Sequence, residues 1–445
     1  MHYDLIIKNG TIVTPKKYFK GDITVKNGKI EKCGFSEKSS TADEIFDANG
    51  LHVLPGIIDA HVHFRDPGLT EKEDFETGSI AAAMGGITMI ADMPNVIPPT
   101  STVERFKEKI NIASEKSYID FALYALLNNE NIGRIKDFKK TGALGFKIFL
   151  GTSTGEIASP SLVNLLLHME ECHENDMRIG FHCETSEIND YYTKMFKNIE
   201  INETEKGLLL SAARPVFSEV LAIQTALCYA QYTKAKIHIH HITSADGALL
   251  AAEAKQKGID ITAETCPHYL FLDANDHKQK VYPPLRDKNH KKELWKAIDK
   301  KIIDMVASDH APHTECEKSL PIWDSPAGLC GVETSVPLML NEINNGNLTL
   351  EKYVNLASEA PAKIWGVYPR KGNLNPGADA DITIVDMKKK KIISVNELHS
   401  KSKTSPYDGM KVKGMPVATI VRGSFVMKDG CLTGKKGYGV LIKPE

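Results

Sequence analysis

The middle of the chain alternates short apolar runs with amphipathic stretches, and this alternation predicts its fold. Eight apolar runs have the length and composition of buried strands: residues 57–59, 87–92, 119–124, 145–150, 178–183, 236–242, 260–264 and 303–308. Helix-like segments lie between them, among them residues 73–84, 161–172, 218–232 and 291–298. Strands that alternate with helices form a parallel sheet, and eight such strands close a barrel. We therefore expect an α/β protein with a (β/α)8 TIM-like barrel over residues 55–370.

The two ends of the chain have a different pattern, in which short alternating runs are separated by turns. Asn27-Gly28 lies between Ile23-Thr24-Val25 and Ile30, and this is the strongest short signal for a hairpin. Near the C-terminus, residues 381–385 and 417–421 repeat this alternation. We expect one small β-sandwich domain, assembled from residues 1–54 and 371–445. Two unrelated terminal hairpins are the alternative.

Charge and cysteine usage narrow the range of partners. Among 445 residues, 55 Lys and Arg stand against 57 Asp and Glu, so the net charge of -2 does not favour nucleic acid or an anionic membrane. A small-molecule substrate is the better expectation. The chain has no apolar run of about 18 residues and no secretory signal at its start, and its eight cysteines form no Cys-x-x-Cys pair. We expect a cytoplasmic protein and a homo-oligomer.

The first predicted strand runs into a His-x-His pair. Because residues i and i+2 of a strand point to the same face, His61 and His63 can bind one metal ion. The pair alone could also be the polar end of an ordinary strand. Further candidate ligands are Lys147, within the fourth predicted strand, and His182, His241 and Asp309, at the ends of the fifth, sixth and eighth. The C-terminal ends of barrel strands meet at one face, where a metal site would satisfy all these polar groups together.

Lys147 is the unusual member of this set, because divalent ions would repel a protonated ammonium group. Carboxylation of Nζ by carbon dioxide would convert Lys147 into an anionic carbamate that can bridge two metal ions. Its apolar neighbours in Gly145-Phe146-Lys147-Ile148-Phe149 favour this interpretation over a strand lysine that extends outward into solvent.

Two longer motifs carry a resemblance to a known family. Asp59-Ala60-His61-Val62-His63-Phe64-Arg65-Asp66-Pro67-Gly68 and Ser308-Asp309-His310-Ala311-Pro312-His313 resemble signatures of the cyclic amidohydrolases, and of the dihydroorotases most closely. The resemblance covers essentially the whole chain. It implies His61, His63, Lys147 and Asp309 on the more buried of two divalent ions, with carboxylated Lys147, His182 and His241 on the other. Zinc is the metal it implies, with Asp309 as general base and then general acid.

Substrate choice depends on other residues of the predicted site. Arg65 can bind a substrate carboxylate, and by resemblance Asn95 and His313 complete that carboxylate site. These residues favour dihydroorotate, hydrolysed reversibly to N-carbamoyl-L-aspartate in de novo pyrimidine biosynthesis. Tyr282 stands where dihydroorotases often have asparagine, so this substrate contact departs from the pattern.

Other features leave alternatives open. Residues 213–219 and 264–269 look more like those of allantoinases, so an allantoinase or a hydantoinase remains the alternative. A non-catalytic scaffold relative is a third possibility. It would be expected to lack at least one metal ligand, and every predicted ligand is present in this sequence.

Overall fold

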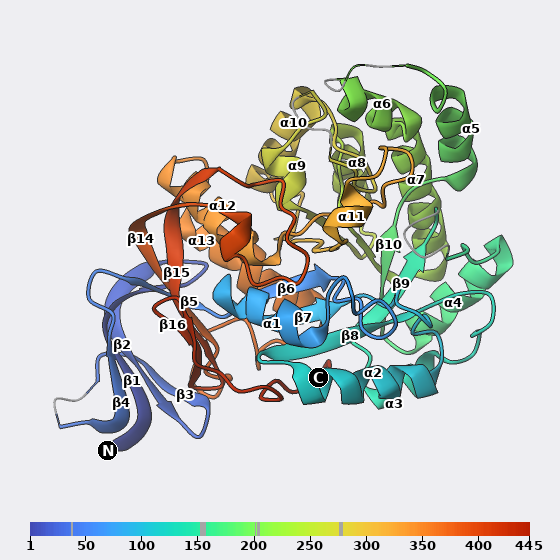
Figure 1. Cartoon of the computed structure of the whole chain (residues 1–445). Coiled ribbons are helices and arrows are strands. Elements are labelled where there is room, and N and C mark those ends of the chain that lie inside the picture. The colour runs from blue at the N-terminus through green and yellow to red at the C-terminus, as the bar shows by residue number, and fades with distance from the viewer. Residues whose placement is uncertain (37–38, 152–156, 201, 203–204, 276–278) are drawn as a thin grey trace.

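The computed structural model describes residues 1–445 except 37–38, 152–156, 201, 203–204 and 276–278. It contains a barrel of parallel strands surrounded by helices, and a separate sheet beside the barrel that contains strands from both ends of the chain (Figure 1). The predicted fold class is therefore confirmed. In the described residues, no helix combines the length and the apolar character needed to cross a bilayer.

The barrel strands follow one another in sequence order. They are β6 (Ile57–Val62), β7 (Ile87–Asp92), β8 (Asp120–Leu126), β9 (Gly145–Phe149), β10 (Arg178–His182), β11 (Lys236–Ile239), β12 (Ile261–Thr265) and β13 (Met305–Val306). Each predicted strand run overlaps one of them. A parallel bridge joins Val62, at the end of β6, to His310 in the segment that follows β13. All residues of β6, β7, β8 and β9 are buried, since helices cover the outside and side chains fill the inside.

Helices connect and cover these strands. They are α1 (Phe75–Met84), α2 (Val103–Lys116), α3 (Ile135–Thr141), α4 (Leu162–Glu174), α5 (Ser186–Phe196), α6 (Lys206–Ala213), α7 (Val216–Thr233), α8 (Ala245–Gln256), α9 (Pro267–Phe271), α10 (Lys288–Asp299), α11 (Glu315–Lys318), α12 (Val332–Asn344), α13 (Leu350–Val354), the π-helical turn Asn355–Glu359 and α14 (Ala360–Ile364). Several begin at the residue types that favour helix starts: Asp74, Thr102 and Ser161 each accept a hydrogen bond from a backbone N–H of the first turn.

The second sheet combines both ends of the chain. Its strands are β1 (His2–Val13), β2 (Tyr18–Lys26), β3 (Lys29–Gly34), β4 (Thr41–Asp47), β5 (His52–Pro55), β14 (Ile382–Ile392), β15 (Lys411–Val421), β16 (Ser424–Lys428) and β17 (Cys431–Leu432). Antiparallel pairing of β5 with β14 joins the two ends, so the alternative of two unrelated hairpins is wrong. The predicted Asn27-Gly28 turn joins β2 to β3, with φ of 52° and 72°.

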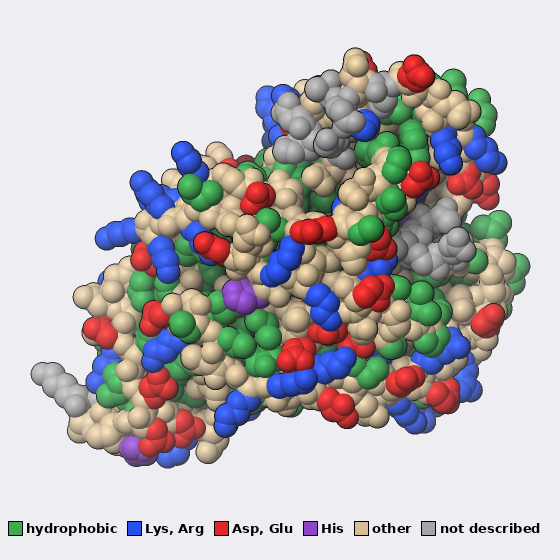
Figure 2. Space-filling model, viewed as in Figure 1, with side chains coloured by type: hydrophobic (Ala, Val, Ile, Leu, Met, Phe, Trp, Pro, Cys, Tyr) green, Lys and Arg blue, Asp and Glu red, His purple; other side chains and the backbone are tan. Residues whose placement is uncertain are grey.

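The sheet has its own core and also packs on the barrel. Residues such as Leu5, Ile23 and Ile382 form a buried cluster that is separate from the barrel core. At the contact with the barrel, the hydroxyl groups of Thr383 and Thr419 donate to the carbonyls of Gly86 and Ala83, both at 2.7 Å. Figure 2 shows acidic and basic side chains interspersed over the face in view, in keeping with the nearly balanced charge.

Candidate metal centre and substrate pocket

A pocket at the C-terminal ends of the barrel strands brings most of the predicted site residues together. Its lining comprises His61, His63, Arg65, Asn95, Lys147, Phe149, His182, His241, Val281, Tyr282, Asp309, Ala311, Ala327 and Gly328. Of the predicted residues, only His313 is not part of this lining. It lies directly behind the pocket wall, with its Nε2 3.2 Å from Nη2 of Arg65.

One group of potential ligands consists of His61, His63 and Asp309. Oδ1 of Asp309 lies 3.1 Å from Nε2 of His63 and 3.3 Å from Nε2 of His61. Burial, followed by the positive charge of Lys147, holds the pKa of His61 well below its ordinary value. Burial alone would raise the pKa of Asp309, but the neighbouring imidazole of His63 lowers it overall. Asp309 is therefore a carboxylate that faces imidazole nitrogens.

The second group consists of Lys147, His182 and His241. Nδ1 of His182 lies 3.1 Å from Nε2 of His241. Nζ of Lys147 is buried and has no hydrogen-bond partner in the described part of the chain. Burial lowers the pKa of this amine to about 8, so a substantial fraction is neutral near physiological pH. A neutral amine is the form that can react with carbon dioxide.

The other ring nitrogens of three of these histidines are held by acceptors behind them. Nδ1 of His61 donates to Glu264 at 2.5 Å, and Nδ1 of His63 donates to the side-chain oxygen of Asn95 at 2.7 Å. Nε2 of His182 donates to Glu184 at 2.9 Å. With protons on these atoms, the nitrogens that face the centre carry lone pairs, which is how proteins orient histidines that bind metals.

This arrangement tests whether the residues fit a divalent metal. Lone-pair nitrogens of His61 and His63 face a carboxylate oxygen at 3.1–3.3 Å, and two acceptors at that distance repel unless a cation lies among them. Imidazole and carboxylate ligands suit zinc and similar divalent ions. The donor set therefore fits a metal centre.

Three pocket residues have backbone conformations in the left-handed region. Arg65 has a φ of 63°, His241 of 37° and Asp309 of 46°. Residues with side chains adopt this region at an energetic cost, and they do so where the surrounding structure fixes them for a function. Each of the three lies just beyond the end of a barrel strand, where this turn helps to direct its side chain into the pocket.

The substrate side of the pocket contains a buried guanidinium group. Arg65 is 1% exposed, and its Nε donates to the carbonyl of Pro312 at 3.2 Å. Burial lowers its pKa to about 10, so it remains cationic at neutral pH. No carboxylate among the described residues forms an ion pair with it. Burial, and then the charge of Arg65, lower the pKa of His313 to about 2, so this ring is neutral.

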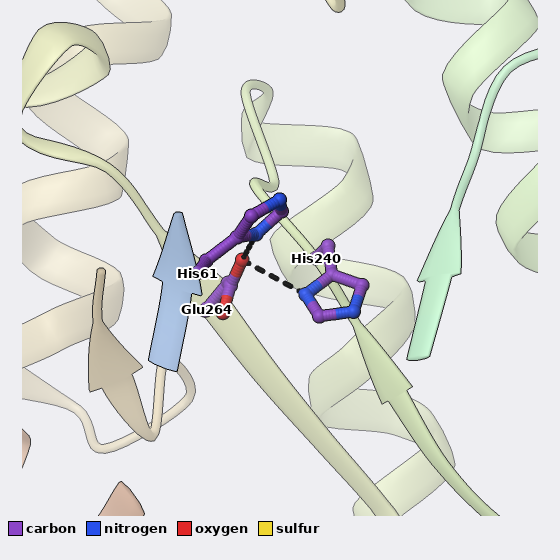
Figure 3. A group of neighbouring side chains, drawn as sticks. All are labelled: His61, His240 and Glu264. Atoms are coloured by element: carbon purple, nitrogen blue, oxygen red, sulfur yellow. Dashed lines mark hydrogen bonds and ion pairs between the residues drawn. The ribbon is translucent and has the colours of Figure 1, made fainter. Parts of the chain in front are cut away.

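Sequence reasoning missed the network beneath His61. The side chain of Glu264, near the end of β12, accepts from Nδ1 of His61 and from Nδ1 of His240 at 3.0 Å (Figure 3). It also accepts from Nε2 of His238 at 3.1 Å. The ring of His240 occupies a space that exists because residue 180 is glycine: a Cβ there would lie 2.0 Å from its Nε2. A charged residue inside an apolar strand, as in Ile261-Thr262-Ala263-Glu264, is the sequence signal that could have revealed this network.

Comparison with known proteins agrees with this geometry. Residues 52–426 match the model of the Amidohydrolase family. A dihydroorotase of Methanosphaera stadtmanae is 36% identical over 96% of this chain and 97% of its own length, and an allantoinase of Deinococcus radiodurans is 35% identical over the full length of both. The solved structure of L-hydantoinase from Arthrobacter aurescens superposes with a TM-score of 0.95 at 34% identity, and it covers 99% of this chain and 100% of its own. The chain therefore belongs to the amidohydrolase family, in its group of cyclic amide hydrolases.

Proposed function

We propose that this enzyme is a dihydroorotase, which hydrolyses the ring amide of (S)-dihydroorotate to N-carbamoyl-L-aspartate and catalyses the reverse cyclisation in pyrimidine biosynthesis. The observation that carries the proposal is the buried guanidinium of Arg65 in the pocket lining. A buried cation without a carboxylate partner is costly, and a substrate that brings a carboxylate would remove that cost. Dihydroorotate carries such a group, whereas allantoin and simple hydantoins do not.

The same proposal assigns the metal ligands. His61, His63, Lys147 and Asp309 would hold one divalent ion, and Lys147, His182 and His241 a second. Zinc is the proposed metal, and carboxylated Lys147 would be the bridging ligand. Bound there, the two ions would lower the pKa of a water molecule and polarise the carbonyl of the ring amide. The low pKa of the Lys147 amine supports carboxylation, because it provides the neutral nucleophile.

Asp309 is the proposed general base and acid. Its carboxylate accepts the proton of the attacking water, and the same proton is then donated to the ring nitrogen as the C–N bond breaks. In the cyclisation direction these transfers run in reverse. Asn95 orients His63 through its side-chain oxygen, while Arg65 and His313 hold the substrate carboxylate away from the reacting amide.

A second candidate is an allantoinase or hydantoinase activity. Tyr282 in the pocket lining favours it, because an aromatic ring can contact a neutral ring substrate, and relatives with both names are about as similar as the dihydroorotases. A non-catalytic scaffold is the least favoured alternative, since the pocket retains every predicted ligand. The cytoplasmic location and the homo-oligomer stay predictions.

A side-by-side assay with dihydroorotate, allantoin and hydantoin tests the assignment. We expect the wild type to prefer dihydroorotate. We expect Arg65→Met to keep its metal content but to lose about 10²- to 10⁴-fold in kcat/KM for dihydroorotate, because an unpaired charge discriminates strongly. The loss on neutral rings should be much smaller. Efficient allantoin hydrolysis without dihydroorotate turnover would contradict the proposal.

A further inference from the structure

Two sequence features that depart from the dihydroorotase pattern lie in contact in the structure. Arg214, in the segment 213–219, precedes α7, and Tyr282 follows α9 by a long connection. Cζ of Arg214 lies 3.5 Å from the centroid of the Tyr282 ring, so the guanidinium stacks on the ring. Tyr282 also lines the pocket. The two departures are therefore in contact, with Tyr282 in the pocket lining and Arg214 stacked on its ring.

The same guanidinium is bonded to the carboxylate behind a metal-ligand candidate. Nε and Nη2 of Arg214 donate to the two oxygens of Glu184, at 2.8 and 2.5 Å. Glu184 in turn accepts from Nε2 of His182. Arg214 is 6% exposed and Glu184 is fully buried. A two-point bond of this kind fixes the plane of the guanidinium, and thus the plane on which Tyr282 stacks.

The backbone of Arg214 is fixed from the other side. Nη1 of Arg286 donates to the carbonyl of Arg214 at 2.5 Å, and Nε of Arg286 donates to the hydroxyl of Thr243 at 2.9 Å. Arg286 lies on the same segment as Tyr282. The segment 282–286 is thus bound to Arg214 both through a ring stack and through a backbone hydrogen bond.

We propose that Arg214 is a positioning residue that couples the orientation of His182 to the place of the Tyr282 ring in the pocket wall. Its role at the ring substrate rests on the proposed function, whereas its role at His182 does not. Lysine at this position would keep the charge but could neither form the two-point bond nor offer a flat face to the ring. The unit thereby links the geometry of one metal ion to the shape of the substrate pocket.

The first test measures binding of the second divalent ion in Arg214→Lys by titrating zinc into metal-free protein and following bound metal. Loss of a partner behind a ligand should weaken the affinity about 10- to 100-fold. Arg178→Lys is the matched control. Arg178 begins strand β10, at the opposite end from His182, and forms an ion pair with Asp260. Its replacement should therefore leave the zinc affinity unchanged. Wild-type affinity in Arg214→Lys would overturn the proposal.

The coupling itself is tested by a double-mutant cycle with Tyr282→Leu, again on affinity for the second ion. If the two residues act as one unit, the double variant should bind zinc about as well as Arg214→Lys alone. Fully additive losses would contradict the coupling. At saturating zinc, KM for the ring that the wild type hydrolyses should rise about tenfold in Arg214→Lys, with a smaller change in kcat.

Glu184→Gln keeps the inference testable if Arg214→Lys does not fold. Glu184 is not part of the pocket lining, yet its change should raise KM at saturating zinc, because the plane of Arg214 is no longer fixed. An unchanged KM would contradict the coupling. If the wild type hydrolyses neither dihydroorotate nor allantoin nor hydantoin, the proposed function fails. The double-mutant cycle on zinc affinity would still decide the role of Arg214.

Discussion

Two buried lysines at opposite ends of the barrel have contrasting surroundings. Lys371 is 1% exposed near the start of β8, where its Nζ lies 2.5 Å from Asp120, 2.7 Å from Asp381 and 2.9 Å from Asp379. Lys147 is also fully buried, but its Nζ has no hydrogen-bond partner in the described structure. Its amine pKa is lowered to about 8 by burial.

The difference separates a structural cluster from a reactive one. The three aspartates near Lys371 could in principle hold a metal ion, but the lysine ammonium already lies among them, and Arg422 also forms an ion pair with Asp120. That cluster is neutralised by the protein itself. At the other end, imidazole lone pairs and a carboxylate face one another beside the Lys147 amine, which has no hydrogen-bond partner among the described residues. Under the proposed function, these groups would bind divalent ions and Lys147 would be carboxylated.

Removing the side-chain amine of Lys147 or of Lys371 should have the largest effects, on activity in the first case and on stability in the second. Lys147→Ala should lose at least about a thousandfold in kcat/KM, because the proposed bridging ligand is gone. Its thermal unfolding should change little by comparison. A short carboxylate such as acetate or propionate, added to the assay, should restore part of the activity. Wild-type turnover and wild-type metal content in Lys147→Ala would contradict the bridging role of Lys147.

Lys371→Met should have the opposite effect. Breaking a buried ion cluster by removing one partner costs about 3–5 kcal/mol of unfolding free energy, while kcat/KM of the folded protein should stay close to wild type. Urea unfolding measures the loss. Lys363→Met is the matched control, since the pair of Lys363 with Glu359 is largely exposed on the lysine side and should contribute less than about 1 kcal/mol. Equal effects of the two changes would show that the cluster is not structural.

Glu264→Gln tests whether Glu264 orients His61 at the metal centre. The change keeps the shape of the side chain but replaces one of the two oxygens that accept from His61, His238 and His240 by an amide nitrogen. Affinity for the more tightly bound ion should fall about 10- to 100-fold, because the orientation of His61 is no longer fixed. A chelator competition with the purified protein measures this affinity. No change would mean that backbone packing alone orients His61.

Reactivation of metal-free protein should depend on pH through Lys147. Only the neutral amine reacts with carbon dioxide, and the neutral fraction rises with pH until the pKa of about 8 is passed. At constant dissolved carbon dioxide and zinc, the initial rate should rise about tenfold per pH unit below 8 and level off above it. A rate that rises steadily through pH 10 would indicate an ordinary lysine.

The sequence was sufficient for the barrel and for the residues that converge at its C-terminal end. Each strand carries a run of apolar residues, and the ligand candidates lie within these runs or directly after them. The rule that strand ends meet was therefore enough to place His61, Lys147 and Asp309 in one pocket. The turn at Asn27-Gly28 was predictable because few residues adopt its backbone conformation readily.

Contacts between distant segments were not predictable in the same way. Glu184 has no local pattern that marks it, and Glu264 stands out only as a charged residue in an apolar strand. The packing of neighbouring strands is what brings the two behind His182 and His61. The stack of Arg214 on Tyr282 joins residues far apart in sequence, with no local pattern to reveal it. Each residue could be singled out, but their contact depends on the tertiary structure.

The metal content of the purified protein, measured alongside its activity during chelation, tests the central claim most directly. We predict about two divalent ions per chain in fully active protein, parallel loss of ions and activity, and recovery of both when zinc and bicarbonate are returned. Lys147→Ala should retain fewer than two ions under the same conditions. Full activity in protein from which the metal has been removed would contradict the account.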